Sequence, residues 1–300
     1  MEFIRSHYGE FAALLTAVFW TITALSFESA SLKIGSLSVN IIRLVLGLVF
    51  LSIFNLFTRG IVLPTDASRF NWIWLSVSGL IGFVLGDLFL FKSYTIIGSR
   101  FSMLIMTLVP PITTLFSWII IGETLKLIHF AGMSLTFSGI AIAIFNRNGK
   151  GEKLSLKLAP SGIFLALGGA VGQALGLVVS KIGLADYDPF AATQIRIIAG
   201  IAGFSLLVTV LSRWNTVGRS LRNKRAMSAT GLGAFFGPFL GVSFSLISIR
   251  HTEAGIAATI MALVPVLIIP PAILLYRQKV TLAEVTGAII SVCGVALFFI

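Results

Sequence analysis

The two halves of this 300-residue chain carry the same pattern of residues. In the later part of each half the matching residues lie 155 positions apart, as with Gly82 and Gly237, Pro110 and Pro265, and Gly139 and Gly294. Nearer the start of each half the spacing is 153, as with Gly9 and Gly162, or Arg43 and Arg196. The repetition predicts two units of one fold, which we place at residues 1–149 and 150–300.

Composition predicts that both units lie in a lipid bilayer. The chain is 57% hydrophobic and only 11% charged, whereas a soluble domain carries about a quarter charged residues. Apolar runs long enough to cross about 30 Å of hydrocarbon recur along it. We expect an all-α membrane protein with ten transmembrane helices, at roughly 9–32, 36–58, 71–94, 97–121, 127–145, 160–182, 189–212, 229–249, 253–275 and 282–300.

The number of segments in each unit determines how the two units are oriented in the membrane. Each unit contains five segments, and an odd number of crossings makes the second unit enter the membrane in the opposite sense. Two inverted five-helix repeats are the signature of secondary transporters, which hold their solute between the repeats near the bilayer midplane.

The net charge of +11 indicates headgroup contacts and orientation in the membrane, and we expect no nucleic-acid partner. We call the face that holds the N-terminus side A and the opposite face side B. Outside the predicted segments, side A carries five Lys and Arg residues and side B carries thirteen. The positive-inside rule then makes side B cytosolic and both termini external.

The repeated residues resemble the EamA-domain branch of the drug/metabolite transporter superfamily. Its halves typically show W-x7-K in the first helix, Arg in the second, Pro in the fourth, then G-E and a closing G-x6-G. This chain has Trp20, Lys181, Arg43, Arg196, Pro110, Pro265, Gly122-Glu123, Gly132 to Gly139 and Gly287 to Gly294. The resemblance implies a transporter with both termini in the cytosol, which is opposite to the charge count.

Three positions depart from that family pattern. Glu28 stands where the family usually has Lys, Gln173 stands where it has Trp, and Arg277-Gln278 replaces the second Gly-Glu. Gln173 therefore joins the candidate solute-binding residues.

Charged residues inside predicted spans are costly and usually face a cavity or a partner. Six stand out in this chain, namely Glu28, Arg43, Asp87, Lys92, Lys181 and Arg196. Glu28 and Arg43 are candidates either for a salt bridge between the first two helices or for a solute or proton role. Asp87 is a candidate proton carrier or a structural partner. Lys181 and Arg196 have no acidic residue within the spans at their depth, which predicts a site that attracts anions, with snorkelling to the interface as the alternative.

Other candidates follow from side-chain chemistry and from helix breaks. Trp20 and Tyr94 are candidate cavity residues because each carries a polar tip that needs a partner. Prolines recur in the fourth segment of each half, at Pro110, Pro111, Pro265, Pro270 and Pro271, and we expect them to break those helices beside a central site. The Gly82-x3-Gly86, Gly237-x3-Gly241 and Gly168-x3-Gly172-x3-Gly176 spacings predict close helix packing.

The motifs that the sequence lacks narrow the function. It contains no H-E-x-x-H metal motif, no nucleotide-binding G-x4-G-K-[ST] loop and no recognisable catalytic constellation. We therefore expect no metal, no cofactor and no enzyme activity. The leading hypothesis is a secondary transporter of small metabolites, amino-acid-like or other small organic solutes, that works outward in a prokaryotic inner membrane. The solute gradient or protons would supply the energy, the oligomeric state is unknown, and a polytopic membrane enzyme or lipid-handling protein is the alternative.

Overall fold

The computed structural model describes residues 6–145, 159–267 and 282–299, and helices joined by turns make up these ranges. The first half contains α2 (Tyr8–Ile34), α3 (Ser36–Arg59), α4 (Arg69–Gly79), the π-helical η1 (Leu80–Gly86), α5 (Asp87–Met106), α6 (Val109–Ile121) and α7 (Leu127–Phe145). The second half contains α8 (Pro160–Leu184), α9 (Pro189–Val210), α10 (Trp214–Ser220), α11 (Lys224–Ala234), the π-helical η2 (Phe235–Gly241), α12 (Val242–His251), α13 (Ala254–Met261), α14 (Val264–Leu267), α16 (Leu282–Ala296) and the short η3 (Leu297–Phe299).

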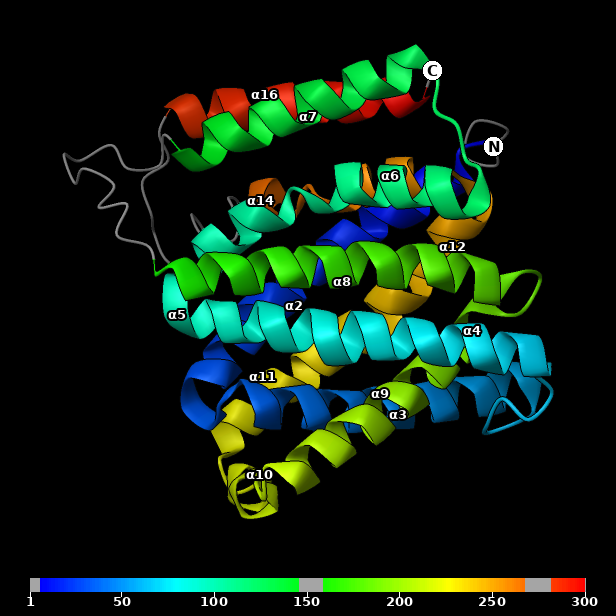
Figure 1. Ribbon diagram of the computed structural model, residues 1–300, viewed down its shortest axis with the longest axis vertical. Coiled ribbons are helices and arrows are strands. Elements are labelled where there is room, and N and C mark those ends of the chain that lie inside the picture. Colours follow the sequence, from blue (N-terminus) through cyan, green and yellow to red (C-terminus); the bar gives the residue numbers. More distant parts are fainter. Residues whose placement is uncertain (1–5, 146–158, 268–281, 300) are drawn as a thin grey trace.

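Six helical stretches are long and apolar enough to cross a membrane. They are Tyr8–Ile34, Ser36–Arg59, Arg69–Ile97, Pro160–Leu184, Pro189–Val210 and Lys224–His251. Shorter apolar helices cover Val109–Ile121, Leu127–Ile142 and Val285–Ala296. The long helices run along one common direction (Figure 1), as expected of segments that cross a single bilayer.

The third helix of each half has the same internal construction. α4 passes directly into η1, and α11 passes into η2 at positions 155 residues later. The side chain of Ser68 caps α4 by accepting from the amide of Asn71, and that of Asn223 caps α11 by accepting from the amide of Ala226. These polar caps satisfy amides that the first turn of a helix leaves free.

The chain reverses direction within the range assigned to α5. Ser93 Oγ lies 2.7 Å from Ser102 Oγ, and the Tyr94 hydroxyl lies 3.5 Å from Met103 Sδ. Nine residues of straight helix would separate such pairs by about 13 Å along the axis. The third and fourth segments of the first half therefore meet here, and the equivalent reversal in the second half lies between α12 and α13.

Contacts between the halves are reciprocal, as expected of a two-fold relation. α7 and α16 lie side by side (Figure 1). Thr136 and Ser291 are repeat equivalents in these two helices. The Thr136 hydroxyl donates to the Ser291 carbonyl at 3.5 Å, and the Ser291 hydroxyl donates to the Thr136 carbonyl at 3.3 Å. In α3 and α9, a Cβ at Gly47 would stand 3.3 Å from the Ile197 side chain, and a Cβ at Gly200 would stand 3.0 Å from that of Leu44. Leu44 is the repeat equivalent of Ile197.

The third helix of each half packs against the first helix of the other half. Gly82 and Gly86 of η1 lie against Gly176 and Gly172 of α8, while Gly241 of η2 lies against Trp20 of α2. A Cβ at Gly172 would stand only 2.7 Å from the Gly86 Cα, so these backbones approach closely because neither residue has a side chain. The predicted role of the Gly82-x3-Gly86 and Gly172-x3-Gly176 spacings in close packing agrees with this contact.

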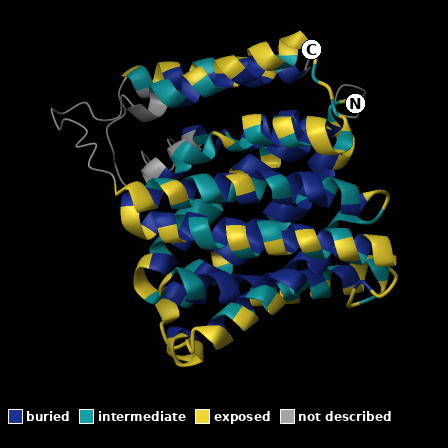
Figure 2. Ribbon diagram, in the orientation of Figure 1, coloured by how far each residue is buried: buried dark blue, intermediate teal, exposed yellow. Residues whose placement is uncertain are grey.

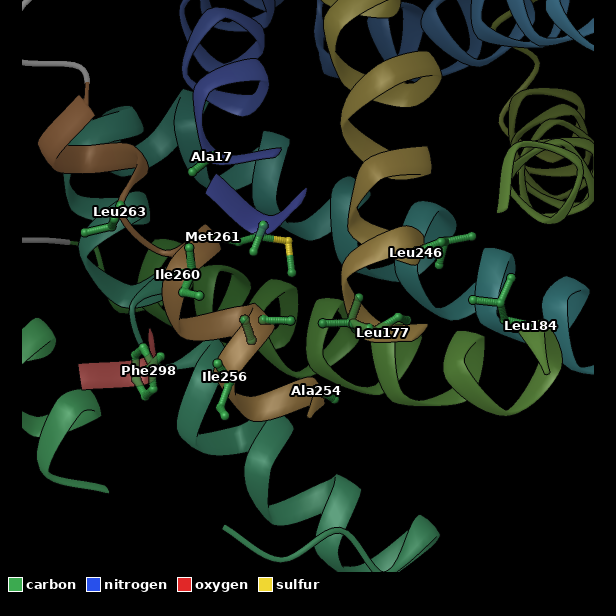
Figure 3. Packing of buried hydrophobic residues seen from close by; sticks show 14 of the residues in the cluster. Ala17, Leu177, Leu184, Leu246, Ala254, Ile256, Ile260, Met261, Leu263 and Phe298 are labelled. Atoms are coloured by element: carbon green, nitrogen blue, oxygen red, sulfur yellow. The ribbon is translucent and has the colours of Figure 1, made fainter. Parts of the chain in front are cut away.

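Apolar residues fill the interior and also cover much of the outside. One buried cluster joins both halves through Ala17 of α2, Leu177 of α8, Leu246 of α12 and Ile260 of α13 (Figure 3). Buried residues gather on the faces that helices turn toward one another (Figure 2), whereas large apolar residues such as Phe57 and Leu127 lie on the surface. An exterior of this kind matches lipid better than water.

Candidate functional site

A cavity of about 170 Å³ lies between the two halves. Aromatic and methionine side chains form much of its wall, namely Trp20, Phe27, Phe83, Phe91, Tyr94, Met103, Met106 and Met261. Its polar side chains are Thr23, Arg43, Asp87, Thr107 and Gln173. An apolar wall with a few convergent polar groups is typical of sites for small organic molecules. We refer to this space as the central cavity.

An ion pair between Arg43 of α3 and Asp87 of α5 lies in the wall of the central cavity. Both residues are only 5% exposed. The Arg43 Nε donates to Asn40 Oδ1 at 3.1 Å, and Asp87 Oδ1 accepts from Gln173 Nε2 at 2.5 Å. A buried charge pair persists when further hydrogen bonds satisfy its remaining atoms, as they do here.

Aromatic rings surround the Arg43 guanidinium. Its central carbon lies 4.9 Å from the Phe91 ring centroid, 5.3 Å from that of Phe27 and 5.8 Å from that of Phe83. Cation–π contacts at these distances stabilise a desolvated cation. The site therefore holds a charged group within a mostly apolar wall.

Glycine packing places Gln173 beside Asp87. A Cβ at Gly86, the residue before Asp87, would stand 3.2 Å from the backbone nitrogen of Gln173. Because η1 and α8 touch through their glycines, the amide of one half reaches the carboxylate of the other. The hydrogen bond between Gln173 and Asp87 thus depends on the small residues of both helices.

Arg196 of α9, the repeat equivalent of Arg43, is also buried, at 5% exposure. Its guanidinium carbon lies 5.0 Å from the centroid of Phe83, the ring that also contacts Arg43. The buried Nε of Arg196 has no hydrogen-bond partner, and Arg196 forms no ion pair with any residue that the structure describes. The two equivalent arginines therefore differ in their pairing, because Arg43 has an ion-pair partner and Arg196 has none among the described residues.

Helix breaks at equivalent positions border the central cavity. α5 ends at Met106 and α6 begins at Val109, while α13 ends at Met261 and α14 begins at Val264. All four of these residues line the cavity. Pro110 and Pro111 lie at the first positions of α6, where a missing backbone N–H costs little. They begin a helix after a break and do not kink its interior.

The other predicted prolines are described less fully. Pro265 is the second residue of α14, whose range is Val264–Leu267, and its side chain lies outside the described part. Pro270 and Pro271 fall outside the described residues.

Lys181 lies away from the central cavity, at side A, and it has an acidic partner. It forms an ion pair with Glu123, just after α6, and donates to the carbonyl of Thr252 at 2.7 Å. The Thr252 hydroxyl donates to Glu10 at 2.8 Å, and Glu123 accepts from the amide of Ala254 at 2.9 Å. The expectation that Lys181 lacks an acidic neighbour is wrong because Glu123 folds back from the loop beyond the predicted span. We call Glu10, Glu123, Lys181 and Thr252 the side-A network.

A second polar cluster connects loops of the two halves on side A. Asp66 pairs with Arg59 and accepts from the Tyr187 hydroxyl at 2.8 Å. Burial and this hydrogen bond raise the pKa of Tyr187 to about 12. The hydroxyl therefore stays protonated near neutral pH and can donate to Asp66.

Five of the nine predicted solute-binding residues line the central cavity, namely Trp20, Arg43, Asp87, Tyr94 and Gln173. Arg196 is not among the lining residues but contacts one of them, Phe83, and Lys92 is exposed. Glu28 is half-buried and close enough to Tyr94 for electrostatic interaction. The salt bridge considered for Glu28 and Arg43 does not form, because Arg43 pairs with Asp87.

Several residues that hold the site were missed in the sequence. Asn40 precedes Arg43 by one helical turn, and that spacing alone could have identified it as a partner. Phe27 and Phe83 gave no signal that distinguished them from other phenylalanines, whereas Phe91 was one of several aromatic residues that the sequence offered for a cavity wall. No group of three or more His, Cys, Asp or Glu side chains suited to a metal occurs among the described residues.

Comparison with known proteins identifies relatives of both halves. The model of the EamA-like transporter family matches residues 7–145 and again residues 160–300. No curated protein matches. A solved structure, titled only as the crystal structure of a protein, superposes with a TM-score of 0.75 at 18% identity and covers 98% of this chain and 96% of that one. That likeness concerns the fold alone.

Proposed function

The chain belongs to the EamA-like transporter family and is an integral, multi-pass membrane protein, and we propose that it is a secondary transporter of small organic metabolites. The observation that carries the proposal is the central cavity between the two repeats. Its wall contains an ion pair, an amide and both helix breaks. Sites of this construction bind solutes in transporters built from repeats.

Alternating access would follow from ten spans in two inverted repeats, at residues 1–149 and 150–300. The reciprocal contacts of α3 with α9 and of α7 with α16 support this arrangement. A two-fold axis in the membrane plane lets the halves exchange conformations, so that the cavity opens first to one side and then to the other.

The positions of the wall residues support one face of the membrane as the face toward which the cavity lies in this conformation. Phe27 lies in the later part of α2 and Arg43 lies in the early part of α3, toward the side-B ends of both helices, while Trp20 lies near the middle of α2. The side-A network connects the two halves at the opposite face. We therefore assign the structure to a state whose side-A path is closed.

The finer parts of the proposal concern direction, energy and location. We propose export of amino-acid-like or other small organic solutes from a prokaryotic inner membrane. Asp87 is a candidate for proton coupling because it is the carboxylate in the cavity wall. The gradient of the solute itself is the alternative source of energy.

A flux assay with purified protein in liposomes tests the proposed function. Liposomes loaded with a labelled panel of amino acids, organic acids and nucleobases should release at least one solute faster than protein-free liposomes. Lys92→Ala, at an exposed position outside the cavity, should retain that flux, whereas a cavity change such as Gln173→Leu should reduce it. Chemical conversion of solute or lipid without flux would instead favour the polytopic enzyme or lipid-handling alternative.

A further inference from the structure

The two repeat-equivalent arginines differ in one respect that bears on the solute. Arg43 forms an ion pair with Asp87, whereas Arg196 forms no ion pair with any described residue and its buried Nε has no hydrogen-bond partner. The repeat equivalent of Asp87 is Val242, which lines the central cavity. The second half therefore retains the arginine but lacks the carboxylate that the first half supplies.

Val242 lies in the same apolar cluster as neighbours of Arg196. It belongs to one buried cluster with Phe83 and with Ile197, the residue after Arg196. The Phe83 ring contacts the Arg196 guanidinium and also lines the cavity, so it connects this arginine to the space that a solute would fill. Gly82 packs closely against the same guanidinium, since a Cβ on it would stand 3.3 Å from Arg196 Nη2.

The charges at this centre do not balance. Two guanidinium groups, Arg43 and Arg196, contact one aromatic ring, Phe83, and the carboxylate of Asp87 forms an ion pair with Arg43 while interacting with Arg196 only at longer range. Both carboxylate oxygens of Asp87 already have partners, one in Arg43 and the other in Gln173. A buried cation without a partner is unfavourable, so a negative group entering the cavity would be stabilised there.

We propose that the transported solute is an organic acid whose carboxylate binds Arg196 as Asp87 binds Arg43. The aromatic and methionine wall would take an apolar body, so the class is a carboxylate on an aromatic or branched aliphatic group. This inference rests on the proposed function and narrows its solute class. Such a site differs from a site for zwitterions. The centre carries one more positive than negative group, so a solute with a net negative charge balances it and a zwitterion does not.

A matched pair of probes tests the inference by binding. The detergent-purified protein would be titrated with 3-phenylpropanoate and with 3-phenylpropanamide, which share one body and differ in charge, and each dissociation constant would come from the rise in Tm. We expect the wild type to prefer the acid by at least about tenfold, the ratio that corresponds to about 1.4 kcal/mol. Arg196→Gln should lose this preference, and Arg196→Lys should retain part of it.

Two controls separate the site from general charge and from folding. Lys92→Gln removes one positive charge at an exposed position, and it should keep the preference of the wild type. Without probe, Arg196→Gln should melt no lower than the wild type, because it removes an unpaired buried charge. A lower Tm for Arg196→Gln would show that Arg196 has a structural partner, which would overturn the inference.

The remaining outcomes of these experiments each support or overturn the inference. Equal responses of the wild type to acid and amide, including no response to either, would overturn the inference, as would a preserved preference in Arg196→Gln. The same acid in the liposome assay distinguishes the two proposals. Acid-selective binding without flux of any solute would contradict the proposed transport, whereas flux without acid preference would contradict only the carboxylate site.

Discussion

At the scale of single residues, the ion pair of Arg43 and Asp87 organises the centre of the protein. Each charge is buried, and each has one further hydrogen-bond partner, Asn40 or Gln173. Removing one member of such a pair leaves the other charge uncompensated, which costs about 3–5 kcal/mol. Removing both charges together costs much less, because no uncompensated charge remains.

We therefore expect Asp87→Asn to lower the Tm of the detergent-purified protein strongly, and Arg43→Gln to do the same. The double variant Arg43→Gln/Asp87→Asn should be more stable than either single variant, with a coupling energy of about 1–3 kcal/mol. Thermal melts of the four proteins complete the cycle. Additive effects would show that the two side chains do not interact in the folded protein.

The sequence predicted which charged residues lie in apolar segments, but it did not predict their partners. Arg43 and Asp87 are 44 positions apart on different helices, so no local spacing connects them. Lys181 was expected to lack an acid because Glu123 falls in a loop, where depth along a span does not apply. Pairing of this kind follows from how helices pack, which sequence periodicity does not specify.

At the scale of helices, contact between η1 and α8 depends on facing glycines. A Cβ at Gly176 would stand 2.9 Å from the Gly82 Cα, and the atom in its path belongs to the backbone. The G-x3-G spacings predicted close helix packing at these residues, but not which helix each of them would meet. The sequence carried no sign of the π-helical turns η1 and η2, because a π turn alters backbone bonding without changing the apolar pattern.

We expect Gly176→Ala to destabilise the protein by about 1–3 kcal/mol, since the two helices must separate to admit the methyl group. Gly231→Ala is the matched control, because Gly231 lies within α11 and a Cβ there meets nothing within 4 Å. That control should leave stability unchanged or raise it by about 0.5–1 kcal/mol through the helix preference of alanine. Equal Tm values for both variants would contradict the close packing.

At the scale of the whole molecule, the two faces of the protein differ. The side-A network joins α2 and the loop after α6 in the first half to α8 and the turn before α13 in the second. The repeat predicts a related arrangement of backbone on side B, but the residues equivalent to Lys181 and Thr252 are Glu28 and Ile97. The repeat therefore conveys the fold, while the residues that hold one face closed are specific to each half.

The proposed alternating access requires the side-A network to separate, and a reversible covalent link tests that requirement. A Cβ at Gly9 would stand 3.0 Å from the Thr252 Cβ, so a separation of the two segments by about 0.5–1 Å would bring the pair to the spacing of about 3.5–4.5 Å in disulfides. Gly9 and Thr252 also belong to different halves, so a bond between them would hold the halves together at side A. The native Cys293 is exposed and would be replaced by serine in every variant.

In that background, oxidised Gly9→Cys/Thr252→Cys should show little or no solute flux in liposomes, and a reducing agent should restore it. The two single-cysteine variants should be insensitive to oxidant, which excludes damage elsewhere as the cause. The link should leave the central cavity intact because neither residue lines it, so the oxidised protein should still bind a solute that the reduced protein carries. Undiminished flux in fully cross-linked protein would mean that side A opens by a path that leaves Gly9 and Thr252 together, and the side-A network would then be structural.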